Sequence, residues 1–209
     1  MNKAKKNAQI LMVLALIANI VIFIQEVRYF AENLGNLKGA VVFFTFDSNI
    51  YAGIVSFIMA FDLIECLIAK RRTAHRGVLI LKYTAACAVM VTFLTVACYL
   101  GPVVHLKNLF KGSQLYAHLL VPIEAFLSLI LLERGAGLKL WHAFFGLIPV
   151  LTYGIFYIYF VLNHVWTDHY HMMLTDPWIL SIGIVAAAFF LLSMVVAGVY
   201  MVVEKVAGK

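Results

Sequence analysis

Charged side chains are scarce in this sequence. Asp, Glu, Lys and Arg together make up 12% of its 209 residues, whereas hydrophobic residues make up 64%. A chain with so little charge cannot cover the surface of a water-soluble domain. The shortage therefore excludes a soluble enzyme or binding module and favours a protein embedded in a lipid bilayer.

Cysteine is also rare, and low-complexity linkers are absent. The three cysteines, Cys66, Cys87 and Cys98, all fall inside long apolar runs, where we interpret them as small apolar side chains. This placement argues against a disulfide framework and against a paired-cysteine metal site. Since no linker separates two units, we expect one membrane domain over residues 1–209.

The sequence contains several long runs of apolar residues. Each is about 18 residues or longer, which is enough to cross the hydrocarbon core as a helix, and none shows the short alternating pattern of a transmembrane barrel. The first run follows three lysines, as in a signal peptide, but lacks a small-residue cleavage site and is interpreted as a retained helix. The sequence thus predicts an all-α integral membrane protein with six transmembrane helices, near residues 8–29, 41–69, 78–100, 114–132, 140–162 and 178–203.

The basic residues are distributed unevenly between the two sides of these helices. Twelve of the 16 Lys and Arg residues fall in the amino tail, the 70–77 loop with Lys82, the 133–139 loop and the carboxyl tail. Because positive charge marks the cytoplasmic side, both termini are predicted to be cytoplasmic. We expect a multipass protein of a bacterial inner (plasma) membrane.

The same charge pattern bears on the partners of the protein. The net charge is +6, but the basic residues sit at the ends of apolar runs and form no stripe with a recognition element. We therefore expect membrane lipids or lipid esters as partners and no nucleic acid. No pattern indicates an oligomeric state.

Two polar side chains stand at matching depths in two helices that run in the same direction. Thr45 and His118 each follow the outer start of their helix by about four residues, or on the order of 6 Å. A hydroxyl beside an imidazole is the minimum for nucleophilic acyl transfer, because the imidazole removes the proton and the oxygen attacks a carbonyl. The alternative is ordinary packing, in which the Thr bonds its own helix and the His makes an interhelical hydrogen bond.

Two further polar residues share the helix face of Thr45. Ser48 and Asn49 follow it at i+3 and i+4. Asn49 is a candidate donor to a developing oxyanion, and Ser48 is a candidate alternative nucleophile. Chemistry of this kind runs through side chains alone, so we expect no cofactor.

Two short segments carry a resemblance to a known family. The segment 43–49, FFTFDSN, opens the second predicted helix, and the segment 118–122, HLLVP, opens the fourth. Both resemble the androgen-induced protein family of six-helix intramembrane hydrolases, and this chain looks most like a compact microbial relative. The resemblance implies a Thr nucleophile and a His at the positions of Thr45 and His118. It also implies the cleavage of fatty acid esters of hydroxy fatty acids, as in the animal members.

A metal site on the outer face is a competing interpretation. His164, Asp168 and His171 fall at i, i+4 and i+7 and would share one side if the loop were helical. His169 and His105 could add ligands, and two His with a carboxylate suit Zn or Fe. The same stretch could equally form an interfacial lid.

Two non-hydrolytic functions also stay open. A transporter would normally show repeats, broken helices or a charge near the bilayer midplane, for which Asn19 and Glu124 are the modest candidates. In a lipid-binding or assembly protein, Thr45 and His118 would be incidental polar packing.

Overall fold

A computed structural model describes residues 3–101, 109–170 and 178–207, which form helices joined by turns. In this part of the chain, six helices are long and apolar enough to cross a membrane: Asn7–Ala40, Phe44–Ile68, Arg76–Cys98, Ser113–Leu132, Leu140–Leu162 and Trp178–Ala207. The all-α class and the six spans are confirmed. The protein is a multipass membrane protein.

The first helix is longer than the apolar pattern predicted. α1 (Lys3–Asn33) continues into η1 (Leu34–Asn36) and α2 (Leu37–Ala40), where the sequence indicated an outer loop. An Arg28–Glu32 ion pair of 3.1 Å supports the additional turn at i and i+4. The Asn33 amide donates to the Tyr29 carbonyl at 2.8 Å and so satisfies one of the last carbonyls of the helix. Local polar contacts therefore extend the helix beyond its apolar run.

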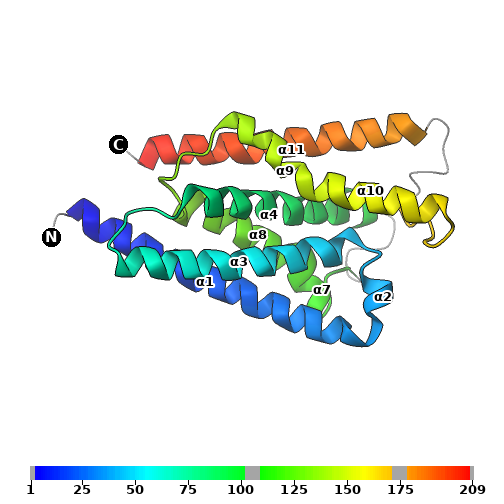
Figure 1. Cartoon of the computed structure of the whole chain (residues 1–209), viewed down its shortest axis with the longest axis horizontal. Helices are drawn as coiled ribbons and strands as arrows, with labels where there is room; N and C mark the ends of the chain where they lie inside the picture. Colours follow the sequence, from blue (N-terminus) through cyan, green and yellow to red (C-terminus); the bar gives the residue numbers. More distant parts are fainter. Residues whose placement is uncertain (1–2, 102–108, 171–177, 208–209) are drawn as a thin grey trace.

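The helices pack as a bundle around α4 (Arg76–Thr95), which continues as the π-helical turn η2 (Val96–Leu100). α1 packs along α3 (Phe44–Ile68), and α3 packs along α4, as Figure 1 shows. The chain enters and leaves at the same end of the bundle, while α2 lies at the opposite end. Tyr83, Leu79 and Val89 of α4 are fully buried, as expected for a central helix.

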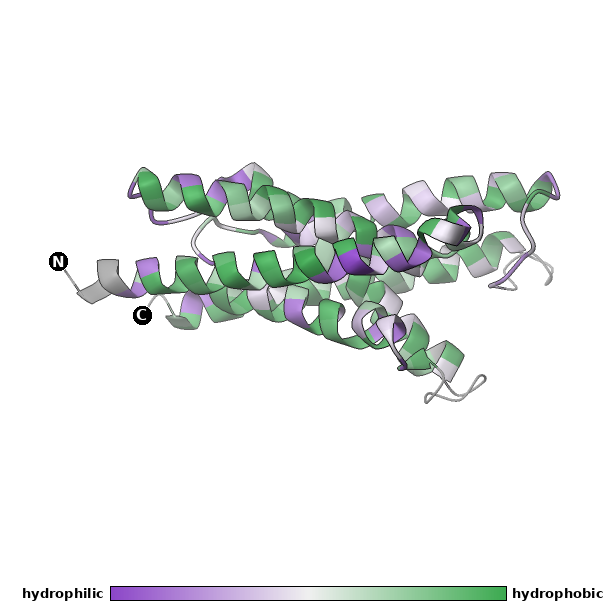
Figure 2. Ribbon diagram, turned by 90° about the horizontal axis from the view of Figure 1, so that it is seen from below, coloured by the Kyte–Doolittle hydropathy of each residue, from purple (hydrophilic) through white to green (hydrophobic). Residues whose placement is uncertain are grey.

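The outer helices keep apolar faces that no other helix covers. Ile155 and Phe156 on one helix and Ile184 on the next are more than half exposed. Figure 2 shows that hydrophobic residues dominate every long helix and that hydrophilic ones gather near the helix ends and in one stretch of α1. Apolar surface of this kind faces lipid chains in a membrane protein.

The fourth span alternates between α and π geometry. It is built from α7 (Ser113–Leu115), η3 (Tyr116–Leu120), α8 (Val121–Leu127) and η4 (Ser128–Leu132). The N–H of Val121 bonds the Tyr116 carbonyl, five residues back, and Pro122 has no N–H to donate. The carbonyl of Ala117 is therefore left to find a partner on another helix.

The fifth span begins where a glycine lets three helices meet. It comprises η5 (Leu140–His142), α9 (Ala143–Gly146) and α10 (Ile148–Leu162), and α11 (Trp178–Ala207) follows. A Cβ atom at Gly146 would lie 1.8 Å from the Ser193 hydroxyl oxygen of α11 and 3.2 Å from the Cys87 sulfur of α4. The hydroxyl of Tyr83 bonds Ser193 at the same junction. Gly146 thus allows α9 to pack closely against α11 and α4.

Candidate functional site

A cavity of about 580 Å³ lies at the end of the bundle that holds α2, away from the chain termini. All six spans contribute to its walls, which are mostly apolar. Thr45 and His118 both line it. The structure thus brings the two predicted site residues to one cavity, which has the size and character of a ligand site.

Thr45 is the second residue of α3 and is half-buried. The preceding N–H, of Phe44, donates to the Tyr170 hydroxyl at 3.1 Å. Within the described ranges, neither the N–H nor the hydroxyl of Thr45 has a hydrogen-bond partner. First-turn N–H groups have no partner in their own helix, and they carry the positive end of its dipole. Thr45 therefore offers a hydroxyl and a backbone donor side by side.

His118 lies in the π-helical turn η3 and is buried. Its Nδ1 stands 2.8 Å from the Leu109 carbonyl oxygen. A carbonyl oxygen can only accept, so Nδ1 carries the hydrogen and Nε2 keeps its lone pair in the neutral ring. This tautomer leaves Nε2 able to accept a proton.

Asn49 connects the two turns that carry these residues. Its amide nitrogen donates to the Thr45 carbonyl at 2.7 Å and to the Ala117 carbonyl at 3.2 Å. The second acceptor is the carbonyl that Pro122 leaves without a backbone donor. Both amide hydrogens are used in this way, so none remains for an oxyanion, whereas the N–H of Thr45 has no acceptor among the described residues.

Ser48 does not line this cavity. Its hydroxyl lies 3.1 Å from the Thr45 carbonyl and 2.9 Å from the Thr92 hydroxyl. It lines a second cavity of about 550 Å³ between α3 and α10, together with Asp47. The two neighbouring hydroxyls, of Thr45 and Ser48, thus serve different spaces.

No hydrogen bond joins Thr45 to His118 in the described part of the chain. Their association rests on the shared cavity and on the Asn49 bridge between their turns. Catalytic hydrogen bonds commonly tighten only when substrate is bound, so this geometry is compatible with a catalytic pair.

The segment after α10 contributes His169 and Tyr170 to the cavity wall and is held by Tyr157 of α10. Tyr157 donates to the Asp168 carboxylate at 2.7 Å and accepts from the N–H of Tyr170 at 3.1 Å. Burial raises the pKa of Tyr170, so its hydroxyl stays protonated at neutral pH. The aromatic residues of the fifth span, Tyr153 and Tyr157 among them, were candidates from the sequence to lie along a lipid chain, although such clusters are more often plain core or interfacial belt.

His164 and Asp168, the two predicted outer metal ligands that the structure describes, do not lie on a helix. α10 ends at Leu162, and the residues from 163 to 170 form turns, with His164 at a positive φ of 57°. Asp168 is held by Tyr157. His171 and His105 lie outside the described residues.

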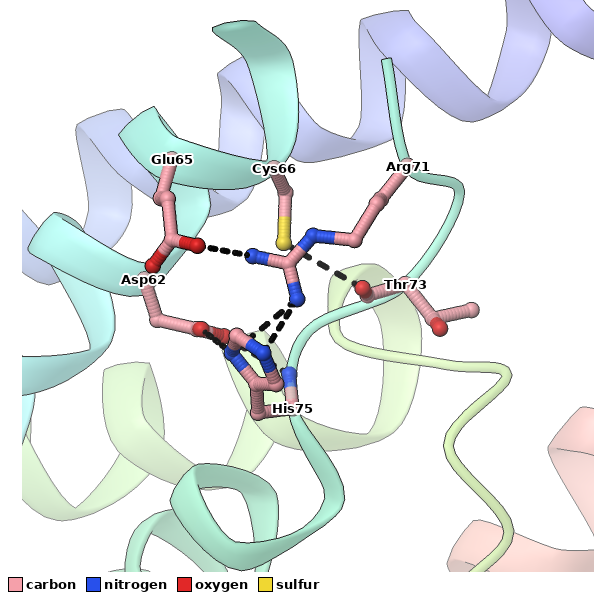
Figure 3. A network of polar contacts seen from close by, with 6 residues as sticks. All are labelled: Asp62, Glu65, Cys66, Arg71, Thr73 and His75. Carbon is pink, nitrogen blue, oxygen red and sulfur yellow. Dashed lines mark hydrogen bonds and ion pairs between the residues drawn. The ribbon is translucent and has the colours of Figure 1, made fainter. Parts of the chain in front are cut away.

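A different polar cluster lies at the other end of α3, as Figure 3 shows. Asp62, Glu65 and His75 offer ligand atoms within 4.8 Å of one another. Arg71 reaches into the group, bonding Glu65 at 2.9 Å and contacting the His75 ring, while Asp62 accepts from the N–H of His75 at 2.8 Å and contacts its ring. The guanidinium supplies the positive charge that a metal ion would bring, so this cluster fastens the turn between α3 and α4.

Comparison of the chain with protein-family models, with curated proteins and with solved structures finds no match.

Proposed function

We propose that this protein is an intramembrane hydrolase of lipid esters that uses Thr45 as nucleophile and His118 as general base. The observation that carries the proposal is that both residues line one largely apolar cavity. The tautomer of His118 adds support, because it leaves Nε2 free to take a proton.

The proposed reaction proceeds in two steps. The Thr45 hydroxyl transfers its proton to His118 Nε2 while its oxygen attacks the ester carbonyl, and the N–H of Thr45 stabilises the oxyanion. The alcohol leaves with the proton held by His118, and an acyl-threonine remains. Water then attacks the acyl group, His118 takes a proton from it, and the free acid and the Thr45 hydroxyl are regenerated.

The walls of the cavity favour a long-chain substrate. Val96, Leu100, Ile182, Val185 and Phe189 are among the apolar side chains that surround the two polar residues. An acyl chain that entered this cavity from the bilayer would exchange contacts with lipid chains for contacts with apolar side chains. Its ester carbonyl would be the group that needs polar partners. Esters of fatty acids, including esters of hydroxy fatty acids, fit this distribution.

The placement in the membrane is part of the same proposal. The basic loops put both termini in the cytoplasm, and the cavity then opens toward the outer side of a bacterial inner membrane. Lipids are the proposed partners, and no cofactor takes part in the proposed steps.

The experiment is covalent labelling of the purified protein in detergent. A fluorophosphonate probe should add once to the wild type, and intact mass should show no adduct in Thr45→Ala. Hydrolysis of a long-chain ester should fall by at least about 100-fold in both Thr45→Ala and His118→Ala, without additive losses in the double variant, because the two residues act as a unit.

Ser48→Ala and Thr95→Ala are the matched controls. Ser48 is the neighbouring hydroxyl that lines the other cavity, and Thr95 lines the same cavity as Thr45 from α4. Both variants should keep the adduct and a substantial part of the turnover. Full hydrolysis by Thr45→Ala, or loss of the adduct only in Ser48→Ala, would refute the assignment of Thr45 as the nucleophile.

Lipid binding without hydrolysis is the second candidate. The observation in its favour is that no hydrogen bond joins Thr45 to His118 among the described residues. A protein of this kind would retain a fatty acid ester through purification without cleaving it, and Thr45→Val would leave that retention unchanged. Ester turnover that depends on Thr45 separates the two candidates.

A further inference from the structure

Glu26 lies deep in the helix bundle, on the face of α1 that packs against α3. It is 3% exposed. A Cβ atom at Gly53 of α3 would lie 2.7 Å from the Glu26 Cβ, so this glycine makes the space in which the carboxylic side chain lies. Gly53 follows Thr45 by about 12 Å along α3 and precedes Asp62 by about 13 Å. Glu26 is therefore near the middle of the span, away from both polar ends.

Among the described residues, the surroundings of Glu26 hold acidic and neutral groups, and no side chain donates a hydrogen bond to it. Its Oε2 is buried without a hydrogen-bond partner. Glu124 of α8 and Tyr29 of α1 interact with it electrostatically, and Gly53 of α3 packs against its side chain. Gln25 donates to Glu124 at 3.4 Å, and one oxygen of each is also buried and unpartnered. Three acceptor oxygens thus gather in the interior with nothing donating to them.

The one fully buried cation among the described residues is already engaged. Lys82 of α4 donates to Asn19 at 2.7 Å and to Ser56 at 3.0 Å. The other end of the Asn19 amide donates to Glu133 at 2.6 Å, and the Ser128 hydroxyl donates to the same carboxylate oxygen at 2.6 Å. Lys82 interacts electrostatically with Glu133 and is joined to it through Asn19, so Glu133 is the counter-ion of Lys82.

The charge balance then leaves a deficit of positive charge. The buried ammonium group interacts with Glu133 and Glu124, whereas the charged neighbour of Glu26 is Glu124, another acid. An ionised carboxylate at membrane depth without a partner costs several kcal/mol, and protonation removes this cost. Glu124 and Glu133 each accept a hydrogen bond, whereas Glu26 accepts none in the described part of the chain.

We propose that Glu26, with Glu124 beside it, is a proton-binding site in the membrane interior whose proton exchanges by way of the cavity. Tyr29 lies next to Glu26 and shares a hydrogen bond with Gln114, and both Tyr29 and Gln114 line the cavity. The ligand is a proton and not Ca²⁺ or Mg²⁺, because these ions take about six or more oxygen ligands, and only three unpartnered oxygens lie here among the described residues. The proposal does not depend on the chemistry of Thr45.

The test uses dicyclohexylcarbodiimide, an apolar reagent that reacts with protonated carboxyl groups in water-poor surroundings. The carboxyl proton moves to a nitrogen of the carbodiimide, the carboxyl oxygen adds to its central carbon, and rearrangement leaves a stable N-acylurea. The full-length protein in detergent should carry one such group on Glu26, located by peptide mass mapping. The extent of modification should fall as the pH is raised, because the reactive proton leaves.

Glu26→Gln and Glu32→Gln form the matched pair of variants. Glu32 is on the same helix, but it is solvent-exposed and paired with Arg28, so Glu32→Gln should keep the modification and Glu26→Gln should lose it. The wild-type infrared spectrum should also contain the carbonyl band of a protonated carboxylic acid. This band detects the protonated carboxyl group in the unmodified wild-type protein, so it does not depend on the folding of a variant. Wild-type protein that elutes as a folded species but shows neither modification of Glu26 nor this band would overturn the proposal.

Competition by salt distinguishes a proton from a metal cation. Sodium and choline chlorides at equal ionic strength and constant pH should have equal effects on the modification. Protection by sodium alone would overturn the proton assignment and indicate a metal-cation site.

Discussion

Replacing Gly146 by alanine should destabilise the protein, although alanine is the better helix former. A Cβ atom there would lie 1.8 Å from the Ser193 hydroxyl oxygen and 3.0 Å from the Ser193 Cβ. Ser193 is fully buried, and its hydroxyl is held 2.8 Å from that of Tyr83, so it has no free volume to move into. The substitution forces α9 and α11 apart or turns Ser193 away from Tyr83.

The expected magnitude follows from three contributions. Overpacking of a close interior contact costs about 1–3 kcal/mol. Loss of the hydrogen bond between Tyr83 and Ser193 costs about 1 kcal/mol, while the change from glycine to alanine in a helix returns about 0.5–1 kcal/mol. We therefore expect Gly146→Ala to lower the free energy of unfolding by about 1–3 kcal/mol.

Gly154→Ala is the matched control, because a Cβ atom at Gly154 in α10 meets nothing within 4 Å. This variant should gain about 0.5–1 kcal/mol from helix propensity alone. The assay is unfolding in mixed micelles by titration with a denaturing detergent. Equal stability of the two variants would refute the contact, and Gly146→Ala combined with Ser193→Ala should recover most of the loss.

Two further substitutions test the polar contacts between helices. Asn49→Leu leaves the buried Ala117 carbonyl without its donor and should lower the free energy of unfolding by about 1 kcal/mol. Its control is Asn163→Leu, because the Asn163 amide bonds an exposed turn of its own helix, and this variant should change the free energy of unfolding by less than about 0.5 kcal/mol. Equal effects of the two variants in the same micelle titration would contradict the Asn49 bridge. Lys82→Met leaves Glu133 without its counter-ion and should cost about 3–5 kcal/mol. Adding Glu133→Gln to Lys82→Met should restore part of that loss, and a double variant that loses the sum of the two single effects would show that the pair is not coupled.

The long apolar runs determined the class of fold. A membrane span depends on about 20 consecutive residues, so it can be recognised in the sequence without knowledge of distant contacts. The rarity of ionisable groups in those runs also brought Thr45 and His118 forward as candidates. Their common depth could be read from the sequence, since helices of the same direction rise by the same distance per residue. The continuation of α1 to Asn33 was missed, because an ion pair and a side-chain cap extend it where hydropathy falls.

What only the tertiary structure decided is which of these groups meet. Asn49 and Ala117 are far apart in sequence, and their hydrogen bond depends on a π-helical turn and a proline that a periodic pattern does not predict. Glu26 is isolated because Gly53 on another helix makes room for it, and its neighbours come from separate spans. Each span is hydrophobic on all sides, so the sequence alone could not say which face packs inward; packing between helices fixes that face.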